Sequence, residues 1–285
     1  MKAQLIDGKR ISAEIKAEAA EEAAALKAKG ITPCLAVVLV GDDSASQVYV
    51  NNKKKACEAV GIRSVSHVLS GGTTEEALLK LIAKLNADKD IHGILVQMPV
   101  PKQIDERKVI LAIDPKKDVD CFHPVNVGNL HTGGEGFLPC TPAGIIELIK
   151  RSGHSIEGKQ CVVIGRSNIV GKPVAMLLMQ ENGTVTICHS KTRNLAELCR
   201  GADIIVSAVG KVNTVTADMV KEGAILIDVG MNRNEAGKLC GDVDFENVKE
   251  IAGAITPVPG GVGPMTIAML MKNCNTAAKI QNGLK

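Results

Sequence analysis

The chain has 285 residues, of which 45% are hydrophobic and 23% charged, with a net charge of +3 at pH 7. This is ordinary globular composition, and at roughly 150 residues per domain it predicts about two domains. Acids and bases are mixed along the chain, and it holds three Phe, one Tyr and no Trp, so nucleic-acid binding is not expected.

The nine cysteines are scattered, with no C-x2-C or C-x4-C pair. This spacing favours neither a disulfide framework nor a zinc site, and we expect most thiols to be small buried side chains in a reducing compartment. There is no run of 18 apolar residues and no apolar signal segment at the N-terminus. We therefore expect a cytoplasmic protein that has no metal site and does not bind membranes.

The first half of the chain alternates between strand and helix patterns. Three apolar or β-branched segments are interpreted as strands: 34–41, 63–69 and 92–99. Helices are expected over 11–29, from Ser44 to about Val60, and after Thr73. Ser44 with Gln47 and Thr73 with Glu76 have capping-box spacing. Such alternation predicts a parallel sheet with crossover helices.

The second half repeats this alternation after a stretch richer in Gly, Pro and His. That stretch, residues 113–141, is interpreted as a linker, and a helix over 141–152 is expected to bridge two lobes. Strands are expected over 161–165, 184–188, 204–209 and 224–229, with 254–256 as a candidate fifth. An apolar helix from about Met265 to Ile280 ends the chain. The predicted fold class is therefore α/β with two lobes.

A glycine turn follows the first strand of this second series. Gly165 ends the strand and Gly171 opens a helix, in the sequence GRSNIVG. A Rossmann domain binds pyrophosphate at such a turn, because glycines let the backbone approach and the helix N-terminus provides N–H groups. Ser167 stands where the second Gly of G-x-G-x-x-G would be, and the last Gly is one residue late. A βα turn without a ligand therefore remains an alternative.

The end of the next strand favours NADP over NAD. An NAD enzyme usually has Asp or Glu there to bind the ribose 2′-hydroxyl, but this chain has His189, Ser190 and Lys191. Together with Arg166 in the glycine turn, these groups suit a 2′-phosphate. The alternative is that Lys191 and Arg193 are solvated loop charges.

A candidate catalytic pair lies on the second predicted helix. Tyr49 and Lys53 are four residues apart and so share a helix face. The tyrosine ring can stack on a flat ligand, and a partly desolvated lysine can donate or accept a proton. The alternative is that Lys53, Lys54 and Lys55 form a solvated charge run.

Three further features point to a ligand site. Gln97 lies at the carboxyl end of an apolar strand, as a pocket group or as a hydrogen-bonded core residue. Asp120 is a candidate for binding N–H groups of a heterocycle, with a salt bridge to Lys116 or Lys117 as the alternative. The segment PVPGGVGPMT, residues 257–266, lies just before a predicted helix. Its prolines and glycines give it a stiff backbone with few side chains, which favours a substrate-lining role.

Six motifs together resemble the bifunctional methylenetetrahydrofolate dehydrogenase/cyclohydrolase family. They occur in family order: YVNNK at 49–53, GILVQMP at 93–99, KDVD at 117–120, PCTP at 139–142, GRSNIVGKP at 165–173 and PGGVGPMT at 259–266. The resemblance implies a catalytic lobe of residues 1–140, joined by the C-terminal helix 265–285, and a Rossmann lobe of residues 141–264. It also implies a folate cleft between the lobes and a homodimer.

The resemblance implies roles for single residues. Lys53 matches the family's catalytic lysine, Tyr49 its ring-stacking tyrosine, and Gln97 the partner of that lysine. The implied substrate-binding residues are Tyr49, Lys53, Gln97, Asp120, Pro259, Gly260, Gly261, Val262, Gly263 and Pro264. The implied NADP contacts are Gly165, Arg166, Ser167, Gly171, Ser190 and Met231.

Two positions depart from the family pattern. Met98 stands where Leu is common, which is a tolerable change of volume. Cys121 stands where Gly is common. If that position requires a positive φ, Cys121 would carry backbone strain and could shift Asp120.

The implied function is NADP-dependent oxidation of 5,10-methylenetetrahydrofolate to the 5,10-methenyl compound and its hydrolysis to 10-formyltetrahydrofolate, in one-carbon metabolism. Positioning would serve the hydride transfer, and Lys53 held by Gln97 would manage the protons of hydrolysis. The alternatives are a dehydrogenase without cyclohydrolase activity and a non-catalytic NADP-sensing module. An NADP reductase of small hydroxy or keto acids would leave Tyr49, Lys53, Gln97 and Asp120 unexplained.

Overall fold

The computed structural model describes residues 2–284, except for the side chains of Ser44 and Ala45. It divides the chain into two compact units. Unit 1 holds the described residues through Ala13 together with Thr141–Thr266, and unit 2 holds Glu14–Cys140 and the described residues from Ile267 onward. The divisions fall inside helix α1 (Gly8–Ala28) and close to the start of helix α10 (Val262–Gln281).

Unit 1 is built on a six-stranded parallel sheet in the order β1-β11-β8-β7-β5-β6. Its strands are β1 (Gln4–Leu5), β5 (Gln160–Ile164), β6 (Thr184–Cys188), β7 (Ile204–Ser207), β8 (Ile225–Asp228) and β11 (Ala254–Ile255). The strands predicted in the second half are thus confirmed, whereas β1 was not predicted. The chain order reverses at β5, which pairs with β6 on one side and β7 on the other. Open α/β sheets bind ligands at such a point, beyond the carboxyl ends of the strands.

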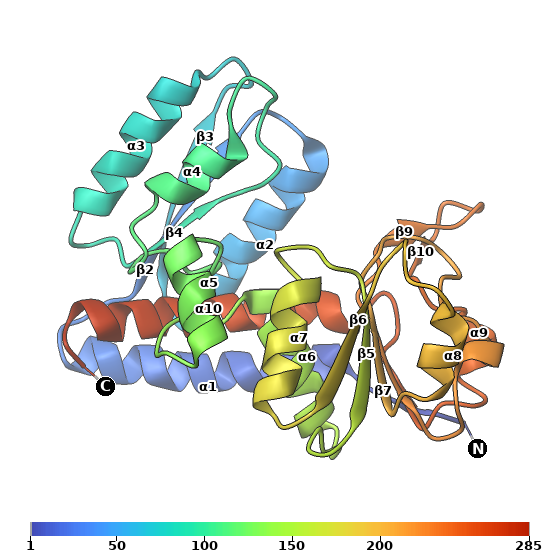
Figure 1. Cartoon of the computed structure of the whole chain (residues 1–285). Coiled ribbons are helices and arrows are strands. Elements are labelled where there is room, and N and C mark those ends of the chain that lie inside the picture. The colour runs from blue at the N-terminus through green and yellow to red at the C-terminus, as the bar shows by residue number, and fades with distance from the viewer. Residues whose placement is uncertain (1, 285) are drawn as a thin grey trace. The chain divides into compact units, whose positions relative to one another are not determined.

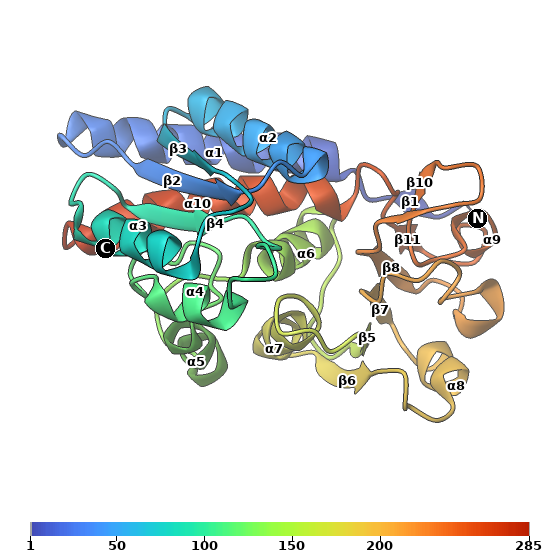
Figure 2. The same ribbon diagram turned by 90° about the horizontal axis from the view of Figure 1, so that it is seen from above.

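Helices cover both faces of the unit 1 sheet (Figures 1 and 2). Helices α6 (Cys140–Arg151) and α7 (Gly171–Gln180) lie on one side, and α8 (Leu195–Arg200) and α9 (Phe245–Val248) on the other. The second side holds an aliphatic core that includes Ile164, Ile205 and Leu226. The remaining elements of this unit are η1 (Ala217–Met219) and the antiparallel pair β9 (Asn232–Arg233) and β10 (Leu239–Cys240).

Unit 2 contains a three-stranded parallel sheet in the order β3-β2-β4. The strands are β2 (Cys34–Val40), β3 (Arg63–Leu69) and β4 (Gly93–Val96), and they confirm the predicted parallel sheet. All seven residues of β2 are buried, because α2 (Ser44–Val60) and α3 (Glu75–Ala87) lie on opposite sides of the sheet (Figure 2). Continuous burial on both faces explains why this strand reads as an unbroken apolar run.

The helix starts of unit 2 differ in part from the sequence prediction. Asp43 caps α2, because its carboxylate accepts a hydrogen bond from the Ser46 N–H at 2.8 Å; the Ser44 side chain of the predicted capping box lies outside the described residues. Thr74, not Thr73, caps α3, and its hydroxyl accepts from the Ala77 N–H at 3.2 Å. In both places the residue just before the helix carries a suitable oxygen and takes the cap position.

The interpretation of residues 113–141 as a linker was wrong, because they contain helix α5 (Pro124–Thr132). His123 caps this helix, Pro124 occupies its first turn, and Gly133 ends it at a φ of 72°. Proline at the start and glycine after the end are helix boundary signals. In so short a helix, the boundary residues make up much of the sequence, so its composition resembles that of a linker. A further helix, α4 (Glu106–Ala112), was also not expected.

The cysteines behave as the sequence predicted. All nine lie among the described residues as free thiols, and eight of them are buried, Cys240 being the exception. Burial raises the pKa of several of these thiols, for instance that of Cys57 to about 12. Among residues 2–284, no helix is both long and apolar enough to cross a membrane.

Candidate active site

Lys53 differs from the neighbouring lysines in its burial. Only 9% of its surface is exposed, whereas Lys54 and Lys55 are exposed as expected for a solvated run. Its ammonium donates a hydrogen bond to Gln97 Oε1 at 3.0 Å. The helix therefore turns one amine of the run inward, where lost hydration is compensated by a polar partner.

Gln97 follows directly after β4, which ends at Val96, three residues before the end of the predicted strand 92–99. Its backbone N–H still donates to the Val38 carbonyl at 2.8 Å, so it continues the sheet pairing. Its side-chain Nε2 donates to the Met98 carbonyl at 2.8 Å. This bond orients the amide so that Oε1 faces Lys53. Both ends of the amide are thus occupied, and its orientation is determined by its partners.

Asp120 carries the second charge of the site. Burial raises the pKa of this half-buried carboxyl, while the ammonium of Lys53 acts in the opposite direction. The alternative of a salt bridge to Lys117 does not hold, because that ammonium donates to the carbonyls of Leu85 and Asp88 at 2.9 and 2.6 Å. A small pocket beside Asp120 is lined by apolar residues of β4 and α4 and by Asp118 and Phe122.

The segment around Asp120 has a fixed conformation. Cys121 has a φ of 60°, so this position does require the left-handed region that favours glycine. The buried Asp118 carboxylate accepts hydrogen bonds from the backbone N–H groups of Phe122 and His123 at 3.2 and 2.8 Å, and from Asn126 Nδ2 at 2.8 Å. These bonds hold the turn in which the strained cysteine sits.

Tyr49 lies one turn before Lys53 on α2, as expected. Its side chain is 41% exposed. A large aromatic ring left this accessible beside a buried lysine is available for contact with a ligand.

The glycine turn of unit 1 has the geometry that the sequence predicted. Gly165 follows β5 with a φ of 125°, and Gly171 begins α7. A Cβ added at Gly165 would lie 2.5 Å from the Ala208 carbonyl oxygen, and one at Gly171 would lie 2.3 Å from the Gly165 carbonyl oxygen. Ser167 Oγ accepts from the N–H groups of Val170 and Gly171, both at 3.2 Å. The serine that replaces the second glycine therefore contacts the first N–H groups of the helix.

The groups expected around a 2′-phosphate are exposed at the same edge of the sheet. Arg166 follows β5, and Ser190 and Lys191 follow β6, the strand that pairs with β5. The Lys191 N–H donates to His189 Nδ1 at 3.1 Å, which shapes the turn that carries them. Met231, after β8, is 58% exposed. The guanidinium of Arg166, the hydroxyl of Ser190 and the ammonium of Lys191 suit an anionic ligand.

Two buried carboxylates that the sequence analysis missed organise this edge. Asp242 accepts from the N–H groups of Val209 and Lys211 at 2.8 and 2.9 Å, and from Ser207 Oγ at 3.1 Å, and so holds the segment after β7. Asp228, at the end of β8, accepts from three backbone N–H groups, yet burial raises its pKa to about 6. For Asp228 the signal available in the sequence was an acidic residue at the end of an apolar strand.

The loop of residues 257–266 is shorter than predicted, because α10 begins at Val262 and includes Gly263 and Pro264. Its bare backbone serves close packing within unit 1. A Cβ at Gly8 would lie 1.8 Å from the Gly261 carbonyl oxygen, and one at Gly261 would lie 2.6 Å from the Pro257 carbonyl oxygen. Pro259 follows a cis peptide bond and is exposed, and Gly260 has a φ of 107°.

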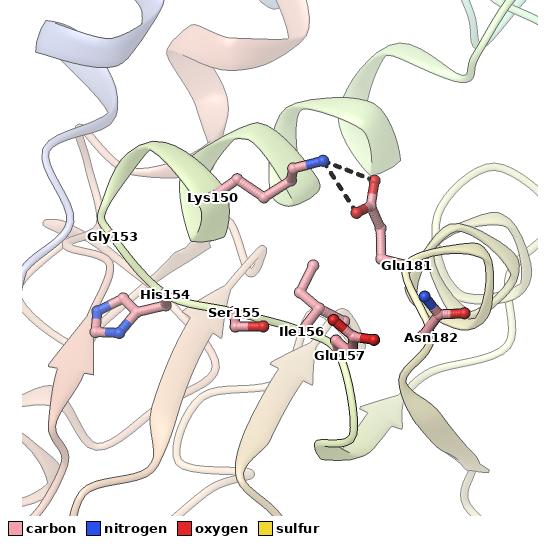
Figure 3. Close-up of a pocket in the computed structure, with 8 residues that line it drawn as sticks. All are labelled: Lys150, Gly153, His154, Ser155, Ile156, Glu157, Glu181 and Asn182. Atoms are coloured by element: carbon pink, nitrogen blue, oxygen red, sulfur yellow. Dashed lines mark hydrogen bonds and ion pairs between the residues drawn. The ribbon is translucent and has the colours of Figure 1, made fainter.

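A pocket of unit 1 lies away from the glycine turn (Figure 3). It is lined by the segments that lead into β5 and β6, at the amino ends of these strands, and by Lys150, whose ammonium pairs with Glu181 at 2.9 Å. Since parallel sheets bind ligands beyond the carboxyl ends of their strands, this pocket is not the candidate nucleotide site.

Lys53, Gln97 and Asp120 are thus gathered in unit 2, while the glycine turn, Ser190, Met231 and residues 259–264 belong to unit 1. Within residues 2–284, no group of three or more His, Cys, Asp or Glu could hold a metal ion.

Comparison with known proteins agrees with this division of groups. The catalytic domain of tetrahydrofolate dehydrogenase/cyclohydrolase matches residues 6–120, and the NAD(P)-binding domain of the same enzyme matches residues 139–282. The bifunctional protein FolD of Agathobacter rectalis is 62% identical over 277 residues, which cover 97% of this chain and 99% of that protein.

Solved structures show the same likeness. The bifunctional FolD methylenetetrahydrofolate dehydrogenase/cyclohydrolase of Campylobacter jejuni superposes with a TM-score of 0.95 at 53% identity, covering 98% of this chain and 99% of that one. The methylenetetrahydrofolate dehydrogenase-cyclohydrolase of Trypanosoma brucei, complexed with NADP and an inhibitor, gives a TM-score of 0.92 at 42% identity and covers 98% of both chains. The chain therefore belongs to the tetrahydrofolate dehydrogenase/cyclohydrolase family.

Proposed function

We propose that the chain oxidises 5,10-methylenetetrahydrofolate with NADP and hydrolyses the methenyl product to 10-formyltetrahydrofolate, as a step of one-carbon metabolism. Family membership over both domains supports the pair of activities. The observation that carries the assignment of residues is the buried Lys53 ammonium, bonded to Gln97 and electrostatically coupled to Asp120.

The two reactions differ in what they require of the protein. Bound NADP supplies the hydride acceptor, so the protein mainly positions the methylene carbon for the first step. In the second step water adds to the cationic methenyl carbon and one carbon–nitrogen bond breaks. Lys53, held by Gln97 Oε1, exchanges protons with the attacking water and the departing nitrogen.

The remaining unit 2 residues orient the substrate. Asp120, beside a small apolar-lined pocket, accepts hydrogen bonds from pterin N–H groups. The exposed ring of Tyr49 stacks on the flat heterocycle. The backbone of residues 259–264, in unit 1, lines the folate, although its glycines are also required by their own packing.

The cofactor is held by unit 1. Gly165 and Gly171 let the pyrophosphate approach the start of α7, where N–H groups and the helix dipole favour negative charge. Arg166, Ser167 and Ser190 suit the 2′-phosphate, and Met231 borders the nucleotide. The NADP present in the similar Trypanosoma brucei structure supports this choice of cofactor.

Family resemblance also supports three broader proposals. The catalytic lobe comprises residues 1–140 with the helix 265–285, and the NADP lobe comprises residues 141–264, although strand β1 and the described residues through Ala13 pack in unit 1. The active protein is a cytoplasmic homodimer, and its substrates are tetrahydrofolate derivatives. Sedimentation equilibrium of the purified chain would refute the dimer if it returned a single species of monomer mass.

The test of the proposed function replaces Lys53 by methionine, which matches the length of the lysine stem and removes its amine. We expect Lys53→Met to abolish cyclohydrolase activity and to lower dehydrogenase activity less, so that the methenyl compound accumulates and is seen by its absorbance. The matched control is Lys54→Met, since this neighbour is exposed.

Three outcomes would count against the proposal. Equal loss of both rates in folded Lys53→Met would reject the role of Lys53. Accumulation of the methenyl compound by the wild-type chain would indicate a dehydrogenase alone. A wild-type chain that binds NADP but neither binds nor turns over the folate would indicate a sensing module.

A further inference from the structure

Asn273 of α10 bridges the two chain segments that meet at Asp120. This amide is buried. Its Nδ2 donates to the Val119 carbonyl at 2.7 Å and to the Leu138 carbonyl at 2.8 Å. The two acceptors lie 19 residues apart in the sequence, and both hydrogens of the amide are used.

The same two segments are connected by a pair of thiols. Cys121 Sγ donates to the Phe137 carbonyl at 3.2 Å, and Cys140 Sγ lies 3.5 Å from the Val119 carbonyl oxygen. Cys140 Sγ also lies 3.9 Å from Asp120 Oδ1 and 3.6 Å from Asn273 Nδ2. Thiols are weak donors, so the amide is the strongest of these connections.

The position of these bonds in the chain determines what they control. The Val119 carbonyl belongs to the peptide group that directly precedes Asp120. The following residue is held at a φ of 60°, a conformation that an L-residue keeps only when its surroundings impose it. Without the amide, the Val119 carbonyl keeps only the weak thiol donor of Cys140, and the Leu138 carbonyl loses its bond to Asn273. This loss favours a shift of the backbone towards other donors.

We propose that Asn273 is a positioning residue of the substrate site: by binding both segments it determines where the Asp120 carboxylate points. The inference rests on the proposed function, because it takes Asp120 as the group that binds the pterin. Asn273 acts only through Asp120, so its effect falls on folate binding and not on the nucleotide, whose residues belong to unit 1.

The chain offers a matched control on the same helix. Asn275 is also buried, and its Nδ2 donates to the Ala19 carbonyl at 2.8 Å and to Glu22 Oε2 at 3.4 Å. It connects α10 to α1 within unit 2, and its bonds do not involve the segments around Asp120. Replacing either asparagine by alanine removes a buried amide whose Nδ2 donates to a backbone carbonyl, so both variants are expected to lose stability.

The experiment compares wild type, Asp120→Ala, Asn273→Ala and Asn275→Ala in the dehydrogenase assay. Concentrations of folded enzyme are taken from circular dichroism. We expect Asn273→Ala to raise the KM for methylenetetrahydrofolate about tenfold, because small misplacements of binding groups are costly, and to leave the KM for NADP within twofold. Asn275→Ala should leave both KM values within twofold. If Asn273→Ala does not fold, Asn273→Ser replaces it as the test variant, because its hydroxyl can hold a bridging water in place of the amide. Asn273→Ser is also expected to raise the KM for methylenetetrahydrofolate.

The outcomes separate the inference from the function on which it rests. A wild-type chain inactive with methylenetetrahydrofolate, or an Asp120→Ala variant with an unchanged folate KM, would overturn the proposed function or its pterin-binding residue, and the inference with it. An active wild type in which the Asn273 variants keep their folate KM overturns the inference alone. So does an equal rise in Asn275→Ala, or a rise in the NADP KM that matches that for folate.

Discussion

The backbone strain at Cys121 gives a prediction whose magnitude follows from the structure. An L-residue in the left-handed region costs about 1–2 kcal/mol relative to glycine. Against this, glycine loses about 0.5–1 kcal/mol of chain entropy relative to alanine, and a buried methyl group contributes about 0.8 kcal/mol. These contributions nearly cancel at Cys121, which is buried with a φ of 60°. We therefore expect Cys121→Gly and Cys121→Ala to be about equally stable.

The reference is the same pair of changes at Cys57, which is fully buried in the last turn of α2. There alanine should be favoured over glycine by about 2 kcal/mol, because helix propensity and burial act in the same direction. All four variants lose a sulfur atom, so that loss is common to both comparisons. The strain is then the difference between the two alanine preferences, about 1–2 kcal/mol.

Urea unfolding followed by far-UV circular dichroism measures these free energies of unfolding. Tryptophan fluorescence is not an option in a chain with no Trp. An alanine preference at Cys121 as large as that at Cys57 would refute the strain argument. It would also remove the reason to think that the cysteine disturbs its neighbour Asp120.

Two further predictions concern unit 1. The pKa of Asp228 is raised to about 6, so its ionisation opposes folding: its contribution to stability is greatest below about pH 4 and falls by on the order of 2–3 kcal/mol as the pH rises to about 6. Urea unfolding at several pH values compares wild type with Asp228→Asn. The free energy of unfolding of wild type minus that of the variant should fall as the pH rises. A difference that is flat or grows with pH would mean that the three N–H donors outweigh burial. Gly171→Ala should destabilise the chain by about 1–3 kcal/mol and raise the KM for NADP, because its Cβ would lie 2.3 Å from the Gly165 carbonyl oxygen. The control is Gly128→Ala, in a helix with free space around it, which should be neutral or stabilising. Equal effects of the two changes would argue against the close approach at the turn.

The elements that the sequence predicted best are those with a single strong periodic signal. Strand β2 is an unbroken apolar run because both of its faces are covered, and β3 and β6 were predicted with their observed limits. The glycine turn was predictable because a side chain at Gly165 or Gly171 would clash with a neighbouring backbone carbonyl. Lys53 and Gln97, 44 residues apart, were paired on the family resemblance, and the structure shows the hydrogen bond between them.

Other features depend on contacts that a linear pattern does not contain. Strand β1 has two residues and exists because its backbone pairs with β11 from the other end of unit 1. Asn273 is an ordinary polar residue in an apolar helix until its two carbonyl partners are known. The inward orientation of Lys53, in a run of three lysines, likewise depends on the phase of α2 against the sheet.

The distribution of thiols has a practical consequence for spectroscopy. Eight cysteines are enclosed by the protein, and Cys240, in β10 of unit 1, is the one that is not buried. The thiolate is the reactive form, so maleimide at neutral pH should modify the native chain at Cys240 and spare the enclosed thiols. The natural sequence therefore provides a single attachment point for a fluorophore on the NADP-binding half, and no cysteine needs to be removed first.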